Sequence, residues 1–438
     1  MKIFLICTSI IMMLWSHIVV ASEHPSIDGK FTLTRVATEQ WSAQWCFSKQ
    51  VDKLIFGPVV GTYRTSSWDL DDTNFVLGSH EGEEAIARID GKNFSCVEAR
   101  IRPYEFISEK EYVSFSRFST GGMTVFTGHM IPWVMIDGTP YLVNFEENFV
   151  ALGGEITLAA SSNIDNRRFV YFGPDDQVKS SGSVSIIDKN VPDWLQNLLG
   201  ETLNSIQTIF TRDLKYTPDD PYVFFIGAGH LNDLEGYSIK GGALDNQVQF
   251  TLRGKDILNK KDWTSKDFPR LVAHEIVHTF QSKTWLINGG HLPWLTEGGS
   301  DALAFDILQK SKIWDNDFYL KYKKSIFGRC TKGGSGFAIK TVHELGRYDL
   351  AYSCGAVVNW LAADLVRKYQ PSATSIDIWA TMARDEKGAS VNYEKIFIEA
   401  LMKLGLSDKD RKNLLSFIET KHPDMEKSIN NFMIENDL

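Results

Sequence analysis

The chain has 438 residues, of which 43% are hydrophobic, enough to form more than one packed core. Its 55 acidic residues outnumber its 46 basic residues, which gives a formal net charge of −9. No run of lysine or arginine could follow a phosphate backbone or an anionic membrane surface, so nucleic-acid binding is not expected.

Residues 1–21 have the layout of a secretory signal peptide. Lys2 precedes a largely apolar stretch, and Val19 and Ala21 supply the small residues expected just before a cleavage point. The alternative is an uncleaved anchor helix, for which the stretch is short. We therefore expect an exported protein, periplasmic or extracellular, without stable membrane insertion after signal removal.

Cys7 lies in this predicted signal peptide, and the four cysteines that remain are Cys46, Cys96, Cys330 and Cys354. An even number of cysteines in an oxidising compartment indicates disulfides. Four cysteines allow three connectivities, and the sequence does not choose among them. The simplest pairing joins the two early cysteines to each other and the two late ones to each other.

Residues 22–190 are predicted to form an antiparallel β domain. Short runs of β-branched and aromatic residues alternate there with glycine, aspartate and asparagine, which is typical of strands joined by turns. The runs cover residues 30–36, 53–60, 112–118, 141–152 and 168–172.

From residue 191 onward the apolar residues recur at helical spacing, which places a domain boundary near residue 190. Helices are predicted over residues 192–210, from the Ser265, Asp267 and Pro269 start signals to residue 281, and from Pro293 through residue 304. Two extended segments, 222–227 and 247–252, precede the second of these helices. Beyond residue 349 we expect helices over 351–368, 374–384, 393–404 and 409–420, followed by a charged tail. The chain as a whole is therefore predicted to be of the α+β class.

His274, Glu275 and His278 form an H-E-x-x-H pattern within a predicted helix. Residues four apart share one helix face, so both imidazoles can bind one zinc ion while Glu275 points toward the attacking water. Zinc lowers the pKa of that water, and the carboxylate can take its proton during attack on a carbonyl carbon. The pattern predicts one Zn²⁺ per chain, with Glu275 as general base.

A catalytic zinc usually has three protein ligands, and Glu297 is the best third candidate. Eighteen residues separate it from His278, and it lies on the next predicted helix. Asp301, one turn further, is placed to accept a hydrogen bond from the outer nitrogen of a zinc-binding histidine. The competing third ligand is His291, in a glycine-rich turn.

At these residues the sequence resembles the gluzincin metallopeptidases, in particular the aminopeptidase N and leukotriene hydrolase group and its glycyl aminopeptidase relatives. The zinc pattern and its spacing to Glu297 in Trp-x-x-Glu-Gly carry the first part of the resemblance. The segment Gly242-Ala243-Leu244-Asp245-Asn246 is similar to that group's Gly-Ala-Met-Glu-Asn substrate strand. Tyr352, with Gly355 three residues later, resembles the segment of the group's catalytic tyrosine.

The resemblance is firm over about residues 237–365 and implies an architecture for the rest. Residues 22–190 would form a saddle-like domain, residues 191–325 a thermolysin-like zinc catalytic domain, and residues 326–438 a helical C-terminal region. From the same resemblance we expect the long C-terminal helical domain of the larger members to be missing.

The resemblance also implies roles for the substrate-binding residues. Gly242, Ala243, Asp245 and Asn246 would align the peptide as an added strand, and Asp245 would bind its free α-amino group. The side chain of Asp245 is one methylene shorter than the glutamate of the group. Tyr352 would donate a hydrogen bond to the oxyanion, with Tyr348 as the runner-up.

The sequence therefore predicts an exported zinc aminopeptidase acting on peptide or protein substrates. A thermolysin-like endopeptidase is the first alternative, because Asp245 is short and the C-terminal region is small. A non-catalytic binding protein with the same fold is the second. The complete set of ligands, general base and tyrosine argues against it.

Overall fold

The computed structural model describes residues 25–57, 63–105, 112–159, 167–180, 184–218, 220–259, 262–284, 292–384 and 392–438. The predicted signal peptide and His291 lie outside these residues. Within the described part of the chain, no helix is both long and apolar enough to cross a membrane.

A nine-stranded sheet dominates the N-terminal part, with the strand order β4-β7-β2-β1-β11-β10-β3-β6-β5. Neighbouring strands pair in the antiparallel sense, as predicted, except β1 and β11, which run parallel. The exception is possible because a long stretch of chain separates these two strands, so no tight turn forces them to be antiparallel. The strands are β1 (Ser26–Ala37), β2 (Gln40–Val51), β3 (Lys53–Phe56), β4 (Trp68–Leu70), β5 (Phe75–His80), β6 (Glu83–Arg88), β7 (Phe94–Ile101), β10 (Pro132–Ile136) and β11 (Thr139–Val150), with the short helix α1 at Tyr63–Ser67.

Aromatic side chains fill the inner face of this sheet. Trp41 and Trp45 alternate inward along β2, and the ring of Trp45 lies 5.6 Å from that of Trp68 and 5.7 Å from that of Phe56. Cys46 follows Trp45 and faces Cys96 on β7, to which it is joined by a disulfide. This bridge confirms the first half of the simplest predicted pairing.

Two smaller sheets follow. One has the order β12-β13-β9-β8 and the other the order β14-β15-β16-β18-β17, so β17 is an edge strand of the five-stranded sheet. Their strands are β8 (Phe115–Arg117), β9 (Met123–Phe126), β12 (Ile156–Ala159), β13 (Phe169–Gly173), β14 (Val178–Ser180), β15 (Val184–Ile187), β16 (Val223–His230), β17 (Ser238–Leu244) and β18 (Gln247–Arg253).

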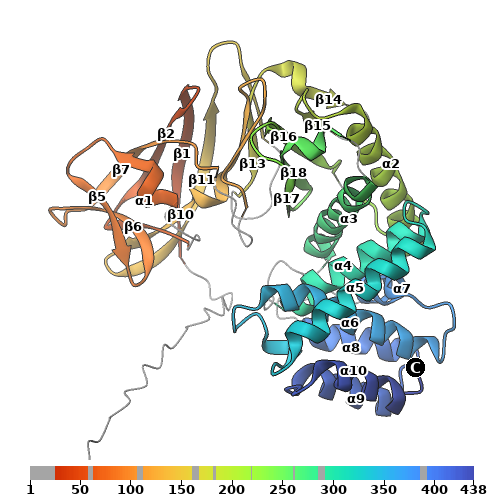
Figure 1. Ribbon diagram of the computed structural model, residues 1–438. Coiled ribbons are helices and arrows are strands. Elements are labelled where there is room, and N and C mark those ends of the chain that lie inside the picture. The colour runs from red at the N-terminus through yellow and green to blue at the C-terminus, as the bar shows by residue number, and fades with distance from the viewer. Residues whose placement is uncertain are drawn as a thin grey trace, which may run out of the picture.

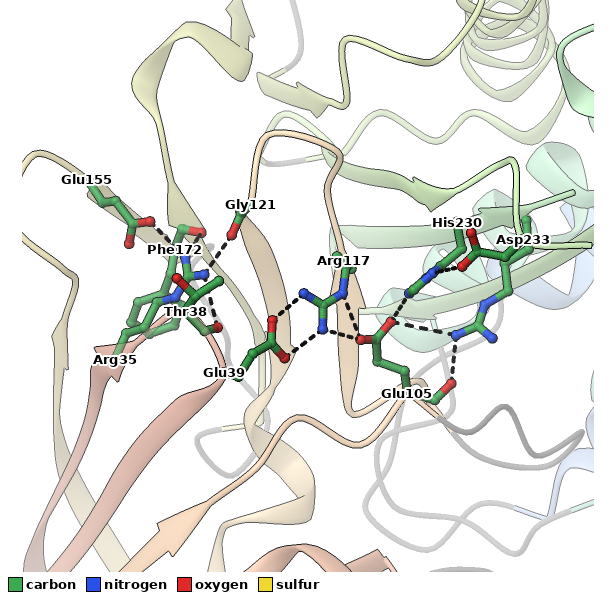
Figure 2. Close-up of polar contacts among 11 residues, drawn as sticks. Arg35, Thr38, Glu39, Glu105, Arg117, Gly121, Glu155, Phe172, His230 and Asp233 are labelled. Carbon is green, nitrogen blue, oxygen red and sulfur yellow. Dashed lines mark hydrogen bonds and ion pairs between the residues drawn. The ribbon is translucent and has the colours of Figure 1, made fainter. Parts of the chain in front are cut away.

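An ion-pair network joins β8 to the ends of β16 and β18 (Figure 2). Arg117 of β8 pairs with Glu39 and, at 2.6 Å, with Glu105, which also contacts His230. Arg253 of β18 donates to the carbonyl oxygen of Glu105 at 2.8 Å. The network therefore fixes β8 and Glu105 against the five-stranded sheet.

The remaining elements are helices, and in Figure 1 helices α4 to α10 lie at the end of the molecule opposite the nine-stranded sheet, with the five-stranded sheet and α3 in between. They are α2 (Asp193–Ile209), α3 (Asp262–Thr284), α4 (Pro293–Lys310), α5 (Asn316–Gly334), α6 (Tyr348–Arg367), α7 (Ser375–Arg384), α8 (Tyr393–Lys403), α9 (Asp408–Glu419) and α10 (Met425–Glu435). The chain is thus of the predicted α+β class. The predicted division at residue 325 stays a prediction, since one hydrophobic core extends from Ile187 to Phe432.

Two helix predictions need correction. The charged tail is wrong, because Met425, Ile429 and Phe432 are buried on one face of α10. Helix α3 begins at Asp262, so Pro269 lies inside the helix instead of in its first turn. Proline is disfavoured inside a helix because it leaves the carbonyl one turn earlier without its hydrogen bond. A proline in a helical pattern therefore favours a helix start, and here this signal was misleading.

Candidate metal centre and its pocket

Three side chains meet at a point between α3 and α4. The Nε2 atom of His278 lies 3.0 Å from Nε2 of His274 and 3.1 Å from Oε2 of Glu297, and the His274 to Glu297 distance is 3.4 Å. Four-coordinate zinc with bonds of about 2.0–2.1 Å separates its ligand atoms by about 3.4 Å. Among the described residues, this trio is the group of histidine and acidic side chains close enough to hold a metal ion. Its spacing and its N, N, O donor set fit zinc.

The outer nitrogens of both histidines are also engaged. Nδ1 of His274 lies 2.9 Å from Oδ1 of Asp301, and Nδ1 of His278 lies 3.0 Å from Oε1 of Gln281 and 3.3 Å from Oγ of Ser300. An acceptor at Nδ1 keeps the proton there and turns the lone pair of Nε2 toward the centre. Asp301 was predicted from the sequence and Gln281 was not, although the position of Gln281 three residues after His278 on a helix could have revealed it.

The electrostatics of the trio favour a cation. Burial opposes the charged form of His274, but the hydrogen bonds and charges of Asp301, Glu297 and Glu275 outweigh it and raise its pKa to about 10. Burial also opposes ionisation of Glu297, but the two histidines hold its pKa well below the ordinary value. A buried group of carboxylates around two imidazoles is stabilised by positive charge, which a divalent metal ion would supply.

Close packing of α4 against α6 brings Glu297 to this point. A Cβ atom built on Gly298 would lie 2.4 Å from Cα of Gly355, and one built on Gly355 would lie 2.1 Å from the carbonyl oxygen of Trp294. The two backbones therefore touch, which only glycine permits. These glycines were not assigned a packing role from the sequence.

A pocket of about 600 Å³ opens beside the trio and is lined by β17, α3, α4, α5 and α6. Glu275 lies in the pocket wall opposite Gly241. A Cβ atom built on Gly241 would lie only 2.6 Å from Oε1 of Glu275. Burial raises the pKa of Glu275 above its ordinary value. The lining residues are Ile239, Lys240, Gly241, Arg270, Leu271, His274, Glu275, Asp301, Arg329, Lys332, Gly333, Asp349, Tyr352 and Ser353.

Tyr352 lies on the pocket wall, and its ring stacks on that of His274 with the centroids 5.7 Å apart. Burial, and then the negative charges of Glu297 and Glu275, raise the pKa of the phenol, so it stays protonated and can donate a hydrogen bond. Tyr348, the alternative tyrosine, is the first residue of α6 and does not line the pocket.

The predicted substrate strand contributes earlier residues to the pocket than expected, namely those from Ile239 to Gly241. Gly242 and Ala243 are in β17, but Asp245 and Asn246 form the two-residue turn after it. Asp245 has a φ of 56° and is 4% exposed, and Asn246 donates to the carbonyl oxygen of Pro221 at 3.0 Å. None of these four predicted residues lines the pocket. The preceding residues of β17 line it instead.

Tyr112, from the chain just before β8, covers the far end of β17. Its hydroxyl donates to the carbonyl oxygen of Ala243 at 2.6 Å, and a Cβ atom on Gly242 would lie 2.6 Å from its ring. No motif in the sequence indicated this contact, which joins residues 131 positions apart.

A second disulfide, Cys330–Cys354, ties α5 to α6. It confirms the other half of the simplest predicted pairing. Cys354 lies two residues after Tyr352, so the bridge fixes the position of α5 relative to the pocket.

Comparisons with known proteins agree with this architecture. No protein-family model matches the chain. No curated protein matches it either. Among solved structures, an aminopeptidase N family protein from Idiomarina loihiensis matches with a TM-score of 0.57 and 12% identity, covering 94% of this chain and 77% of that one.

Two further structures are similar at comparable identity. A mutant of an M1 zinc metallopeptidase from Deinococcus radiodurans, bound to a Tyr-Ser-Ala substrate, matches with a TM-score of 0.51 and 11% identity, covering 92% of this chain and 96% of that one. Legionella pneumophila aminopeptidase A, in complex with aspartic acid, matches with a TM-score of 0.51 and 12% identity, covering 91% of this chain and 49% of that one. The resemblance inferred from the motifs is therefore confirmed at the level of the fold.

Proposed function

We propose that the protein is a zinc-dependent peptidase that removes residues from the amino terminus of peptides. The observation that carries the proposal is the convergence of His274, His278 and Glu297 beside a pocket lined by Glu275 and Tyr352. When bound by the two histidines and Glu297, Zn²⁺ supplies a Lewis acid that lowers the pKa of water and polarises a carbonyl group. The solved structures of similar fold include zinc metallopeptidases and aminopeptidases.

Glu275 would act as the general base of the reaction. Its carboxylate would take a proton from the water that attacks the scissile carbonyl carbon and then pass that proton to the leaving amine. A carboxyl whose pKa is raised by burial is suited to this work, because it is a stronger base than an exposed carboxylate. Tyr352 would donate a hydrogen bond from its protonated phenol to the oxyanion of the tetrahedral intermediate.

The edge of β17 would align the substrate as an added strand, in a thermolysin-like catalytic domain. In a hairpin with a two-residue loop, the flanking residues form a hydrogen-bonded pair, so residues 239, 241 and 243 turn their backbone groups to the free edge. The hydroxyl of Tyr112 donates to the carbonyl oxygen of Ala243, so this carbonyl is not open to a substrate strand. The free edge of β17 is therefore closed two residues after Gly241, the residue that lies against Glu275. This closure favours a substrate that ends near the scissile bond, which supports the exopeptidase proposal.

A thermolysin-like endopeptidase remains the second candidate, and one observation favours it. Asp245, which was predicted to bind the free amino group, is buried in the turn outside the pocket. Its role stays a prediction from the resemblance, and the exopeptidase proposal rests on Tyr112 instead. A non-catalytic protein is not favoured by any feature of the pocket.

We further propose that the chain is exported through cleavage after Ala21. The two disulfides support this proposal, since such bonds persist in oxidising compartments outside the cytoplasm.

The test compares a free peptide such as tetra-alanine with its N-acetylated counterpart, using the wild type and the Glu275→Gln variant. The proposal predicts that the free peptide loses its first residue and that the acetylated one is hydrolysed at least about a hundredfold more slowly. The variant should keep its zinc and lose nearly all hydrolysis, because the ligands remain while the base is gone. Internal cleavage of the acetylated peptide at an equal rate would establish the endopeptidase, and loss of zinc from the variant would refute the role of Glu275.

A further inference from the structure

The pocket has an unusual charge distribution for a protein that is acidic overall. Four cationic side chains line it, together with three acidic ones: Lys240, Arg270, Arg329, Lys332, Glu275, Asp301 and Asp349. Ion pairs with neighbouring side chains neutralise only some of these charges.

Some of the lining charges are neutralised by neighbours. Arg270 pairs with Asp267 at 2.9 Å and lies 3.5 Å from Asp301, which also contacts His274. Asp349 pairs with Arg347 at 2.9 Å. Within the described residues, neither Arg329 nor Lys332 makes an ion pair, so their two positive charges face the pocket uncompensated.

The position of these two cations is fixed by the packing of α5. Arg329 and Lys332 are three residues apart and share a helix face, and Cys330 between them is bonded to Cys354 on α6. A Cβ atom on the adjacent Gly333 would lie 2.7 Å from the side chain of Leu350. The disulfide and this close contact hold the cationic face at the rim of the pocket.

Lys240 adds a third cation to the pocket lining. It precedes Gly241 on β17, and its charge lowers the pKa of Glu275, although burial of that carboxyl raises it more. Tyr112 closes the other end of β17, at Ala243. If the closed side receives the amino end of the substrate, the substrate runs antiparallel to β17 and its carboxyl end extends past Lys240.

We propose that the pocket selects peptides with a carboxylate on the C-terminal side of the scissile bond. The anionic group would lie among Lys240, Arg329 and Lys332. The carboxylate would come from an acidic side chain in the second residue or from the free C-terminus of a short peptide. This inference rests on the proposed aminopeptidase function, because that function sets the direction of the substrate.

The test measures kcat/KM for five tripeptides. They are Ala-Ala-Ala-amide, Ala-Ala-Ala with a free carboxylate, Ala-Asp-Ala-amide, Ala-Lys-Ala-amide and Asp-Ala-Ala-amide. Relative to the neutral amide, we expect a rate about five- to tenfold higher for the peptide with a free carboxylate, for Ala-Asp-Ala-amide or for both, since each partly exposed ion pair contributes only a modest factor. Which of the two rises identifies the source of the carboxylate. Equal rates for all peptides, or an increase confined to Asp-Ala-Ala-amide, would overturn the inference.

A double variant, Arg329→Gln with Lys332→Gln, connects the preference to its residues. In this double variant, the ratio of kcat/KM for the anionic peptides to kcat/KM for the neutral amide should fall to near one. Lys324 is an exposed lysine of α5 outside the pocket, so Lys324→Gln should keep the wild-type ratio. The wild-type ratio should also shrink as sodium chloride rises from about 0.05 to about 0.5 M, because salt screens exposed charges. A ratio that survives in the double variant would show that other groups bind the anion.

Binding separates this inference from the proposed function. The same peptides titrated into the Glu275→Gln variant give dissociation constants that do not require turnover. Tighter binding of the anionic peptides with no hydrolysis by the wild type would leave the anion site standing and remove the peptidase. Hydrolysis of every peptide with equal affinities would do the reverse.

Discussion

Replacement of Gly355 by alanine should damage both stability and the metal centre. The new Cβ atom would lie 2.1 Å from the carbonyl oxygen of Trp294, whereas carbon and oxygen atoms in such contacts lie about 3.3–3.6 Å apart. Helices α4 and α6 would therefore have to separate by about 1 Å. The obstructing oxygen belongs to the backbone and a Cβ atom is fixed by its own backbone, so no side-chain rotation can relieve the clash.

Overpacking of a core usually costs about 1–3 kcal/mol, and this rigid contact should fall near the upper end. The better helix propensity of alanine returns about 0.5–1 kcal/mol, which leaves a net loss of about 2 kcal/mol in the free energy of unfolding. Because Glu297 is adjacent to Gly298 at the same contact, zinc content should fall as well.

Urea unfolding and metal analysis of the purified variant measure these effects. Gly200→Ala in α2 is the matched control, because its added Cβ would meet nothing within 4 Å apart from its chain neighbours and the nearby backbone of its own helix. That control should gain about 0.5–1 kcal/mol and keep its zinc. If the two variants proved equally stable, the backbone contact could not be what sets the distance between α4 and α6.

Four further outcomes are expected. Glu297→Ala should lower zinc content sharply in metal analysis, and full occupancy would return His291 to consideration as the third ligand. Asp301→Asn should weaken zinc affinity by about 10–100-fold in a competition with a chelator, while unchanged affinity would remove its role in orienting His274. Tyr352→Phe should keep zinc and reduce kcat by about 10²–10³-fold with little change in KM, and a normal kcat would exclude it as the oxyanion donor. Replacing Cys330 and Cys354 by serine should cost about 3 kcal/mol in urea unfolding of the oxidised protein, since the bridge closes a loop with a sequence separation of 24, whereas an unchanged midpoint would refute this.

The convergence of the three candidate ligands was predictable because helical geometry is local. The spacing of His274 and His278 places both rings on one face of α3, whatever the rest of the chain does. Glu297 and Asp301 share a face of α4 for the same reason, and a single crossing of two helices then brings all four side chains together. The α+β class and most helices also follow from periodicity in the sequence.

The walls of the pocket could not be predicted in this way. Tyr112 reaches Ala243 across 131 positions of sequence, and Arg329 and Lys332 arrive through a helix that the periodicity did not reveal. Asp245 shows the opposite problem. The motif resembles a substrate strand, but Asp245 lies in a turn of two residues directly after Leu244 and does not line the pocket, so its predicted role stays a prediction. Motif letters do not fix where a strand ends.

The central claim is that His274, His278 and Glu297 hold one zinc ion that supports peptide hydrolysis. The most direct test removes the metal with a chelator and titrates Zn²⁺ back while hydrolysis of a peptide with a free amino terminus is followed. We expect no activity without metal, a linear rise as zinc is added, and a plateau at about one Zn²⁺ per chain. Full activity in the metal-free protein, or no activity at any zinc content, would contradict it.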